Sequence, residues 1–162
     1  MATSSENSIR VRRAQKDDAA ALMLVINAAF RQAEGFFIDE QRVDLESLLD
    51  LLGKGTFLIA ESEGRLLGCV YVEPQGERAY LGLLSVHPEN QQAGLGSRLM
   101  EEAESYCRNL DCRMMDIKIV SLRPELSGFY QRRGYIKLRT SPFPPGVETK
   151  LPCHFIDMSK HL

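Results

Sequence analysis

The sequence has no excess of basic residues. Its 20 lysines and arginines are outnumbered by 22 aspartates and glutamates, which gives a net charge of -2 and a pI near 5.9. A domain that binds nucleic acid normally carries clustered positive charge that neutralises phosphates. The balance of charge therefore argues against nucleic acid as a partner.

Long hydrophobic runs are also missing. The first residues, MATSSENSIRVRR, are polar and contain no apolar core of a secretory signal, and no later run approaches the length of a membrane span. We therefore expect no membrane partner and a cytoplasmic location. Residues 1–8 have the composition of a disordered segment, so we expect them to be flexible.

The cysteines lack the spacing of a metal site. There is no CxxC pair, and no histidines stand at metal-site spacing from Cys69, Cys107, Cys112 or Cys153. We expect reduced, structural thiols and no bound metal.

A linker between domains is missing as well. The chain of 162 residues has a common size for one domain, and it contains no repeat. Its one proline-rich stretch, residues 141–146, lies too close to the C-terminus to leave a second foldable unit behind it. We expect a single domain over residues 1–162.

Apolar periodicity and turn residues predict eleven elements. Strands are expected at residues 9–14, 56–62, 65–73, 78–86, 114–120, 135–139 and 154–158, and helices at 19–30, 44–52, 95–110 and 125–133. The order β-α-α-β-β-β-α-β-α-β-β predicts a mixed α/β sheet. Its fourth and fifth strands should be parallel, because a helix connects them.

Two glycines stand just before the third predicted helix, in the stretch VHPENQQAGLGSRLM (residues 86–100). A helix N-terminus offers unpaired N–H groups and partial positive charge, so a loop without side chains there suits an anion. Leu99 breaks the Rossmann pattern, and no P-loop lysine follows Gly96. On glycine spacing alone, a loop that serves only to start the helix is an equal alternative.

The spacing Gln91-x-x-Gly94-x-Gly96 resembles the pyrophosphate loop of the GNAT superfamily, the acyl-CoA-dependent N-acetyltransferases. The resemblance extends over residues 80–100 and over LRPELSGFYQRRGY (residues 122–135), and the order of elements agrees over nearly the whole chain. It implies a GNAT fold in which the fourth and fifth strands splay apart at a bulge near Leu84 and Ser85. It also implies transfer of an acetyl group from acetyl-CoA to an amine.

The resemblance further implies the residues that bind the cofactor. Backbone N–H groups from Gln92 to Ser97 would hold the pyrophosphate, with Gln91 closing the loop. Strand backbone at residues 84–86 would contact the pantetheine, and the Val86 N–H would stabilise charge on the thioester oxygen. The complete implied set is Leu84, Ser85, Val86, Gln91, Gln92, Ala93, Gly94, Leu95, Gly96, Ser97, Arg123 and Tyr130. Arg98, Arg132 and Arg133 either meet the nucleotide phosphates or are solvated surface residues.

Two positions depart from the family pattern. Arg123 stands where many relatives have an asparagine that contacts the pantetheine or orders the loop. Tyr80 stands where some relatives carry a glutamate base on the fourth strand. Glu73, or a water chain passing Tyr80, could then remove the amine proton, although Glu73 could equally do no more than solvate a strand end.

Tyr130 matches the family's proton donor for the departing thiolate. The alternative is that Tyr130 is a core aromatic residue in an apolar stripe. The acceptor end is expected in the loop after the first helix, at Glu34, Phe36, Phe37 and Arg42, with Tyr80 nearby. Glu34 would attract a protonated amine, while Phe36 and Phe37 either wall an apolar slot or, as an equal alternative, pack this loop onto the sheet.

The acceptor itself is expected to be a small amine or amino-acid derivative. A protein N-terminus or lysine is the alternative among enzymes, and an acyl-CoA sensor is the alternative of another class. Both a monomer and a homodimer are compatible with the sequence.

Overall fold

The computed structural model describes residues 8–91 and 94–162. The described chain forms β1 (Arg10–Arg13), η2 (Lys16–Asp18), α1 (Ala19–Glu34), α2 (Leu45–Lys54), β2 (Thr56–Ser62), β3 (Arg65–Gln75), β4 (Arg78–Val86), η3 (Pro88–Asn90), α3 (Leu95–Asn109), β5 (Met114–Val120), α4 (Glu125–Gln131), β6 (Ile136–Pro142) and β7 (His154–His161). Apart from the two short 3-10 helices, this is the predicted order, which is confirmed. The segment expected to be flexible lies, except for Ser8, outside the described residues.

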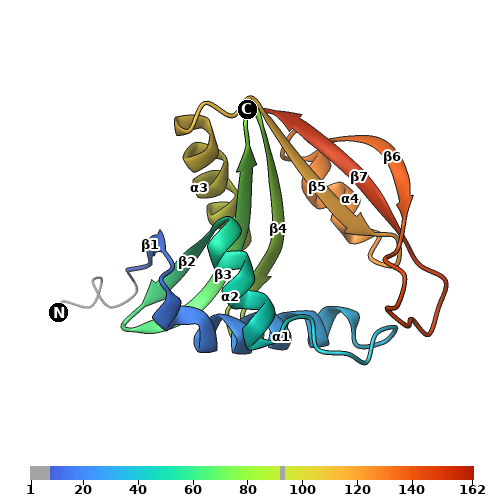
Figure 1. Ribbon diagram of the computed structural model, residues 1–162, viewed down its shortest axis with the longest axis horizontal. Coiled ribbons are helices and arrows are strands. Elements are labelled where there is room, and N and C mark those ends of the chain that lie inside the picture. The colour runs from blue at the N-terminus through green and yellow to red at the C-terminus, as the bar shows by residue number, and fades with distance from the viewer. Residues whose placement is uncertain (1–7, 92–93) are drawn as a thin grey trace.

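One sheet contains the strands of the described chain, in the order β1-β2-β3-β4-β5-β7-β6 (Figure 1). Neighbouring strands are antiparallel except β4 and β5, which are parallel as predicted. Helix α3 makes the crossover between these two strands. The predicted mixed α/β class is therefore confirmed.

The two faces of the sheet are covered by different helices, because side chains alternate along each strand. On β2, Phe57 packs with Leu22 of α1 and Leu48 of α2. The next residue, Leu58, belongs to a second apolar cluster that includes Leu99 of α3. Figure 1 shows α3 on one side of the sheet and α1 with α2 on the other.

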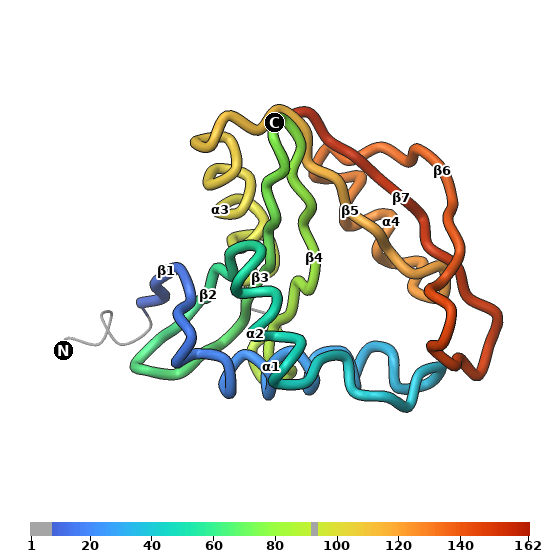
Figure 2. Tube along the Cα trace, in the orientation of Figure 1, coloured from blue at the N-terminus to red at the C-terminus, as the bar shows by residue number. Residues whose placement is uncertain are grey.

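Strands β4 and β5 pair over a short stretch and then separate. Residues 78–80 pair with residues 114–116, after which the two strands diverge (Figure 2). The cause is a β-bulge in β4, where Leu83 and Leu84 together oppose Val70 of β3, and Leu83 has a φ of 53°. A bulge bends its strand and increases the local twist. The predicted splay is confirmed, with the bulge one residue earlier than expected.

Two helices end later than the sequence predicts. The first was expected to end at Phe30, but α1 continues for one more turn to Glu34. Gly53 was expected to stop the second, yet α2 passes through it and ends before the extended backbone of Gly55. A helical glycine costs only about 1 kcal/mol relative to alanine, so packing can outweigh it. The added turn of α1 determines where Glu34 lies.

None of the helices within residues 8–91 and 94–162 combines the length and apolarity needed to cross a bilayer. The same residues hold no group of three or more His, Cys, Asp or Glu side chains arranged to bind a metal ion. The four cysteines are free thiols, and three of them are buried: Cys69, Cys107 and Cys112.

Candidate active site

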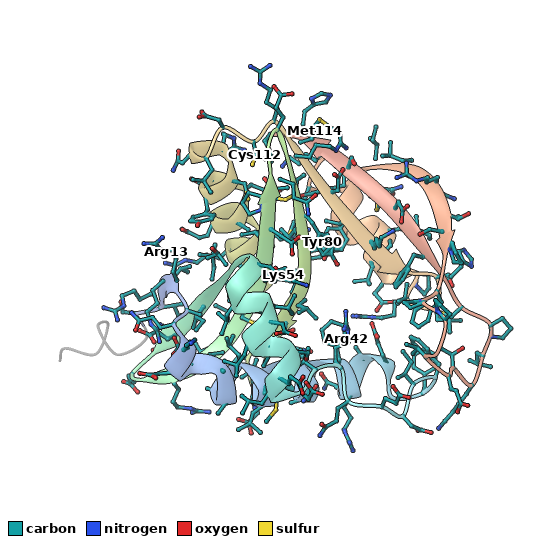
Figure 3. The ribbon with its side chains drawn as sticks, in the orientation of Figure 1. Arg13, Arg42, Lys54, Tyr80, Cys112 and Met114 are labelled. Carbon is teal, nitrogen blue, oxygen red and sulfur yellow. The ribbon has the colours of Figure 1, made fainter. Side chains whose placement is uncertain are left out.

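A cleft of about 1140 Å³ opens where β4 and β5 separate. Its walls come from α1 and the following loop, the second half of β4, the start of α3, β5, α4 and the loop between β6 and β7. Figure 3 shows Tyr80 on β4 and Arg42 on the α1–α2 loop beside this space. The structure brings the following predicted site residues to the cleft: Glu34, Tyr80, Leu84, Val86, Gln91, Gly94, Gly96, Ser97, Arg123 and Tyr130.

The glycine loop leads into an open helix terminus. Gly94 precedes α3 with a φ of 72°, the left-handed conformation that favours glycine. Among the described residues, the first backbone bond of α3 runs from the Arg98 N–H to the Gly94 carbonyl over 3.2 Å, and the N–H groups that precede it have no described partner within the helix. Of the described residues, a Cβ at Gly96 would meet only Phe129, at 3.8 Å, so packing against them does not demand glycine there. Its small size instead leaves the N–H donors open to the cleft.

The end of β4 directs one backbone donor toward the cleft. The His87 N–H donates to the Leu67 carbonyl of β3 over 2.8 Å. Because alternate N–H groups of a strand face opposite edges, the Val86 N–H faces away from β3, on the side where β5 has separated. Nε2 of Gln91 donates to the Val86 carbonyl over 3.2 Å and so holds the start of the glycine loop against the strand.

Tyr130 lies in α4 with its ring packed edge-on against Phe129 and Tyr135, at centroid distances of 5.0 and 5.7 Å. Burial raises the pKa of Tyr130 to about 12, and the positive charge of Arg123 opposes this rise. Within the described chain no group hydrogen bonds to its hydroxyl, which is not sealed from solvent. Tyr130 therefore offers the cleft a neutral phenol that keeps its proton.

Tyr80 folds back over its own strand. A Cβ at Gly82 would lie 2.6 Å from the Tyr80 hydroxyl oxygen, so the absence of a side chain at Gly82 makes room for the ring. Burial raises the pKa of Tyr80, and the positive charge of Arg42 opposes this. The hydroxyl is thus neutral at physiological pH and can both donate and accept a hydrogen bond.

Glu34 ends α1 and is 6% exposed. Its Oε2 accepts a hydrogen bond from Nη1 of Arg123 over 3.2 Å. Burial raises the pKa of the Glu34 carboxyl, while the charges of Arg123 and Arg42 offset part of that rise. Arg123 also donates to Oε2 of Glu125 over 3.2 Å. The cleft therefore contains a buried carboxylate held by an arginine that the sequence could not pair with it.

Glu73, the carboxylate proposed from the sequence as a base, lies away from the cleft. The Tyr71 hydroxyl donates to one of its oxygens over 2.7 Å, and Nε2 of Gln75 donates to the other over 2.7 Å. These bonds lower the pKa of Glu73, which makes it a weaker base. Its position and its partners fit a structural role at the end of β3.

The two adjacent phenylalanines do not line the cleft as expected. The N–H groups of Phe37 and Ile38 both bond to the Glu34 carbonyl, and the resulting turn after α1 sends the Phe37 ring into the core, where it is fully buried. Phe36 is 54% exposed and packs edge-on against Phe37. The loop does line the cleft, but with other side chains, including Ile38 and Arg42.

Some expected cofactor contacts involve side chains that point elsewhere. The Ser85 side chain is buried and donates to the Leu83 carbonyl over 2.9 Å. The backbone N–H of Ser85 faces β3, because it lies two residues before His87, whose N–H bonds to Leu67 of that strand. The Leu95 side chain is buried beneath α3, which leaves its backbone as the group near the cleft. Gln92 and Ala93 lie outside the described residues.

The three candidate phosphate arginines behave differently. Arg132 lines the cleft. Arg133 donates to Oγ of Ser97 and to the Phe129 carbonyl, and its guanidinium lies 3.6 Å from the Phe129 ring centroid. Arg133 thus ties α4 to α3. Arg98 is exposed on α3 and does not contribute to the wall.

Sequence reasoning missed part of the wall made by β5 and β7. Lys118 and Phe155 both line the cleft, with Nζ of Lys118 lying 3.1 Å from Oδ1 of Asp157 and 5.7 Å from the Phe155 ring centroid. Phe143, just after β6, stacks on Phe155 at 4.8 Å. The alternation in residues 117–119 signals that Lys118 faces away from the core, but no local signal reveals that β7 pairs with β5.

The far end of the cleft is bounded by two loops that touch. The Lys150 N–H donates to the Phe37 carbonyl over 2.8 Å. Nζ of Lys150 also lies 3.0 Å from Oδ1 of Asp39. The β6–β7 loop is thereby joined to the α1–α2 loop, and Figure 1 shows the two segments meeting below the separated strands.

A family model described as an acetyltransferase (GNAT) domain matches residues 53–137, which is more than half of the chain. The chain belongs to the GNAT acetyltransferase family. The matched region includes both the glycine loop and Tyr130. The protein is accordingly an acyltransferase, and its acyl donor is acetyl-CoA. A sequence search of curated proteins finds no match.

Solved structures share the GNAT fold over nearly the whole chain. Ribosomal-protein-alanine N-acetyltransferase from Brucella melitensis superposes with a TM-score of 0.78 at 20% identity, covering 94% of this chain and 99% of that one. The ribosomal-protein-S18-alanine N-acetyltransferase of Escherichia coli superposes with a TM-score of 0.76 at 13% sequence identity, covering 95% of this chain and 94% of that one. The protein yncA from Salmonella typhimurium, whose structure contains its cofactor acetyl-CoA, superposes with a TM-score of 0.73 at 20% sequence identity, covering 96% of this chain and 95% of that one. At these identities the likeness shows the fold.

The residues present fit acetyl-CoA. The N-terminus of α3 offers N–H donors that have no partner in the described part of the chain, with no side chains at Gly94 and Gly96, which suits a pyrophosphate. The separated edge of β4 offers backbone along which an extended chain can lie. When bound, acetyl-CoA supplies an acetyl group activated as a thioester.

Proposed function

We propose that the protein acetylates the primary amine of a small molecule or amino-acid derivative, which attacks directly in a ternary complex with acetyl-CoA. The observation that carries this proposal is the position of Tyr130. Its unpartnered, neutral hydroxyl faces a cleft that begins at the glycine-bounded terminus of α3 and ends at two linked loops.

The donor binds along one side of the cleft. The N–H groups of residues 94–97, together with those of Gln92 and Ala93, hold the pyrophosphate, and Gln91 keeps the loop in place. Leu84 and Val86 contact the pantetheine arm. The Val86 N–H stabilises the negative charge that develops on the thioester oxygen, and its orientation away from β3 supports this role.

Tyr130 acts as the general acid for the departing thiolate. A free thiol has a pKa near 8.5, which is too low to draw a proton from a phenol whose pKa is about 12. Burial removes this mismatch, because it disfavours thiolate and phenolate alike. The fully buried Cys69 illustrates the direction of this effect, because burial raises the pKa of its thiol. We infer that the pKa of a thiol inside the cleft is raised in the same direction, which favours transfer of the Tyr130 proton to the departing thiolate.

The contact between the loops favours a small acceptor. An extended peptide needs an open groove, whereas the Lys150 N–H and side chain tie the β6–β7 loop to Phe37 and Asp39 at the end of the cleft. Acetylation of a protein N-terminus is the second candidate. Its support is the similarity in fold to enzymes described as alanine N-acetyltransferases of ribosomal proteins.

A panel of acceptors distinguishes the two candidates. Release of the CoA thiol is followed with acetyl-CoA and either small primary amines and amino-acid derivatives, or peptides with a free N-terminal alanine. We expect kcat/KM to be at least tenfold higher for the best small amine than for any peptide. A preference for the peptides would reject the small acceptor while leaving the transferase assignment intact.

A further inference from the structure

Among the described residues, Glu34 is the buried carboxylate that lines the cleft. The other acidic residues on the wall, Asp39, Glu40 and Glu125, are exposed. The other buried carboxylates, Glu104 and Asp157, lie off the wall and are held by their own partners. A base that removes a proton from an amine bound in the cleft must itself lie on the wall of that cleft. Glu34 meets this condition.

The two oxygens of Glu34 are in different situations. Oε2 is held by Arg123 over 3.2 Å. Oε1 accepts no hydrogen bond from the described residues, and it is not sealed from solvent. Arg123 therefore fixes the carboxylate and leaves one oxygen free to receive a proton.

Arg123 also connects Glu34 to the proposed acid. Its positive charge lowers the pKa of both Glu34 and Tyr130, so the guanidinium lies near both groups. Glu34 comes from the end of α1 and Tyr130 from α4, and both line the same cleft. A base and an acid that lie near the same arginine suit acetyl transfer, in which the amine loses protons and the departing thiolate gains one.

We propose that Glu34 is the general base of the acetyl transfer and that Arg123 positions it. This inference rests on the proposed function of the cleft. It gives a role to the carboxylate that the sequence placed at the acceptor site, and it replaces Glu73 as the candidate base.

The protons balance as follows. The amine enters as an ammonium ion and gives one proton to Oε1 of Glu34. The C–N bond then forms and the C–S bond breaks. Tyr130 gives its proton to the departing sulfur. The nitrogen then loses its second proton, and this proton restores the Tyr130 hydroxyl. Glu34 passes its proton to solvent through the cleft, so the products are the amide, the CoA thiol and one released proton.

The surroundings of Glu34 suit this role. An ordinary carboxyl is a weak base toward an ammonium ion, and burial strengthens it by raising the pKa. The charged groups that face it are Arg123, from the β5–α4 connection, Arg42, from the α1–α2 loop, and Glu125, from α4. The two arginines lower the pKa and Glu125 raises it, but burial is the largest influence.

The decisive test is the pH profile of kcat/KM for wild type and Glu34→Gln, computed on total amine. For an amine with a pKa near 10.4, the unprotonated fraction rises tenfold with each pH unit below that pKa. With a working base, the wild-type profile should be level from the pKa of Glu34 up to that of the amine. Without one, the Glu34→Gln profile should rise tenfold per unit, and activity at pH 7 should fall by about 10²–10⁴-fold.

Glu104→Gln is the matched control, because Glu104 is equally buried and is paired with Lys160, but lies off the cleft. It should lower the unfolding temperature without changing the shape of the profile. If Glu34→Gln keeps the level profile, or if Glu104→Gln changes it in the same way, Glu34 is a structural residue and the proposal is wrong.

A second readout does not depend on activity. Carboxyl ¹³C titration of the unliganded protein, with the Glu34 signal assigned by its loss in Glu34→Gln, should give a pKa above the ordinary 4.5. Arg123→Gln should raise that pKa further, because it removes the neighbouring positive charge. A value at or below 4.5 would contradict the proposal. Failure of the wild type to acetylate small amines would instead reject the proposed acceptor, and the same profiles would be measured with peptides.

Discussion

The backbone N–H of Lys150 donates to the carbonyl of Phe37 over 2.8 Å and thereby joins two loops that are remote in sequence. The same residue reaches Asp39 with its side chain, at 3.0 Å, but both of these side chains are more than half exposed. An exposed ion pair contributes little, so the backbone bond is the stronger connection. The limit on acceptor size that we propose would therefore depend on the path of the main chain at Lys150.

Replacing Lys150 tests this limit. Lys150→Pro removes the N–H donor, and we expect it to raise KM for the small acceptor several-fold while narrowing the preference for small amines over peptides. Lys150→Ala keeps the backbone bond and removes only the ion pair, so it should leave both quantities within about twofold. Acetyl-CoA affinity should be unchanged in both variants. Identical behaviour of the two variants would show that the backbone bond does not shape the acceptor site.

Gly96→Ala should separate folding from cofactor binding. Among the described residues a Cβ there meets Phe129 alone, at 3.8 Å, and alanine favours a helix over glycine by up to about 1 kcal/mol, so the free protein should be at least as stable as wild type. The same Cβ would occupy the space in which we propose that the pyrophosphate lies against the N–H donors. We therefore expect acetyl-CoA to lose at least tenfold in affinity.

The measurement for Gly96→Ala is the unfolding midpoint with and without acetyl-CoA. At about 100 times its dissociation constant, acetyl-CoA should raise the wild-type midpoint by roughly 5 to 10 °C, whereas a tenfold loss of affinity should reduce the shift of the variant to about half of that or less at the same concentration. Gly94→Ala serves as the contrast, because its φ of 72° strains any side chain and should lower the midpoint of the free protein. A normal cofactor shift in Gly96→Ala would place the pyrophosphate elsewhere.

The raised pKa of Tyr130 makes a prediction for alkaline pH. A general acid must be protonated to act, so its contribution disappears as pH rises through its pKa in the folded protein. Burial moves that point from about 10 to about 12, and turnover should therefore show no decline assignable to Tyr130 between pH 8 and pH 10.5. We would measure kcat at saturating acceptor across this range. A fall centred near pH 10 that is absent in Tyr130→Phe would contradict the burial of this hydroxyl.

Much of the fold was predictable because its signals are local. The alternation in residues 56–62 and 65–73 predicts strands, the turn at Glu63 and Gly64 joins them, and the helix between β4 and β5 forces these strands to be parallel. The glycine loop and Tyr130 were placed by their resemblance to a family, and the structure brings them to one cleft. In each case neighbouring residues carried the information.

What the sequence missed depends on distant contacts. The pairing of Glu34 with Arg123 joins residues far apart in the chain, and it requires both the added turn of α1 and the path of the chain after β5. Phe37 is buried because of a turn whose bonds involve backbone groups alone. The partners of Glu73 lie nearby, yet a strand pattern does not show which side chain its oxygens will meet.

The most direct test of the central claim is a comparison of Tyr130→Phe with wild type in two measurements on the same preparation, acetyl-CoA affinity and turnover. If Tyr130 is the proton donor in this cleft, removing its hydroxyl should lower kcat by about 10²–10⁴-fold while leaving the dissociation constant of acetyl-CoA within about threefold. Turnover close to wild type would contradict the account, and so would an equal loss of affinity and turnover, because Tyr130 would then serve packing or binding rather than chemistry.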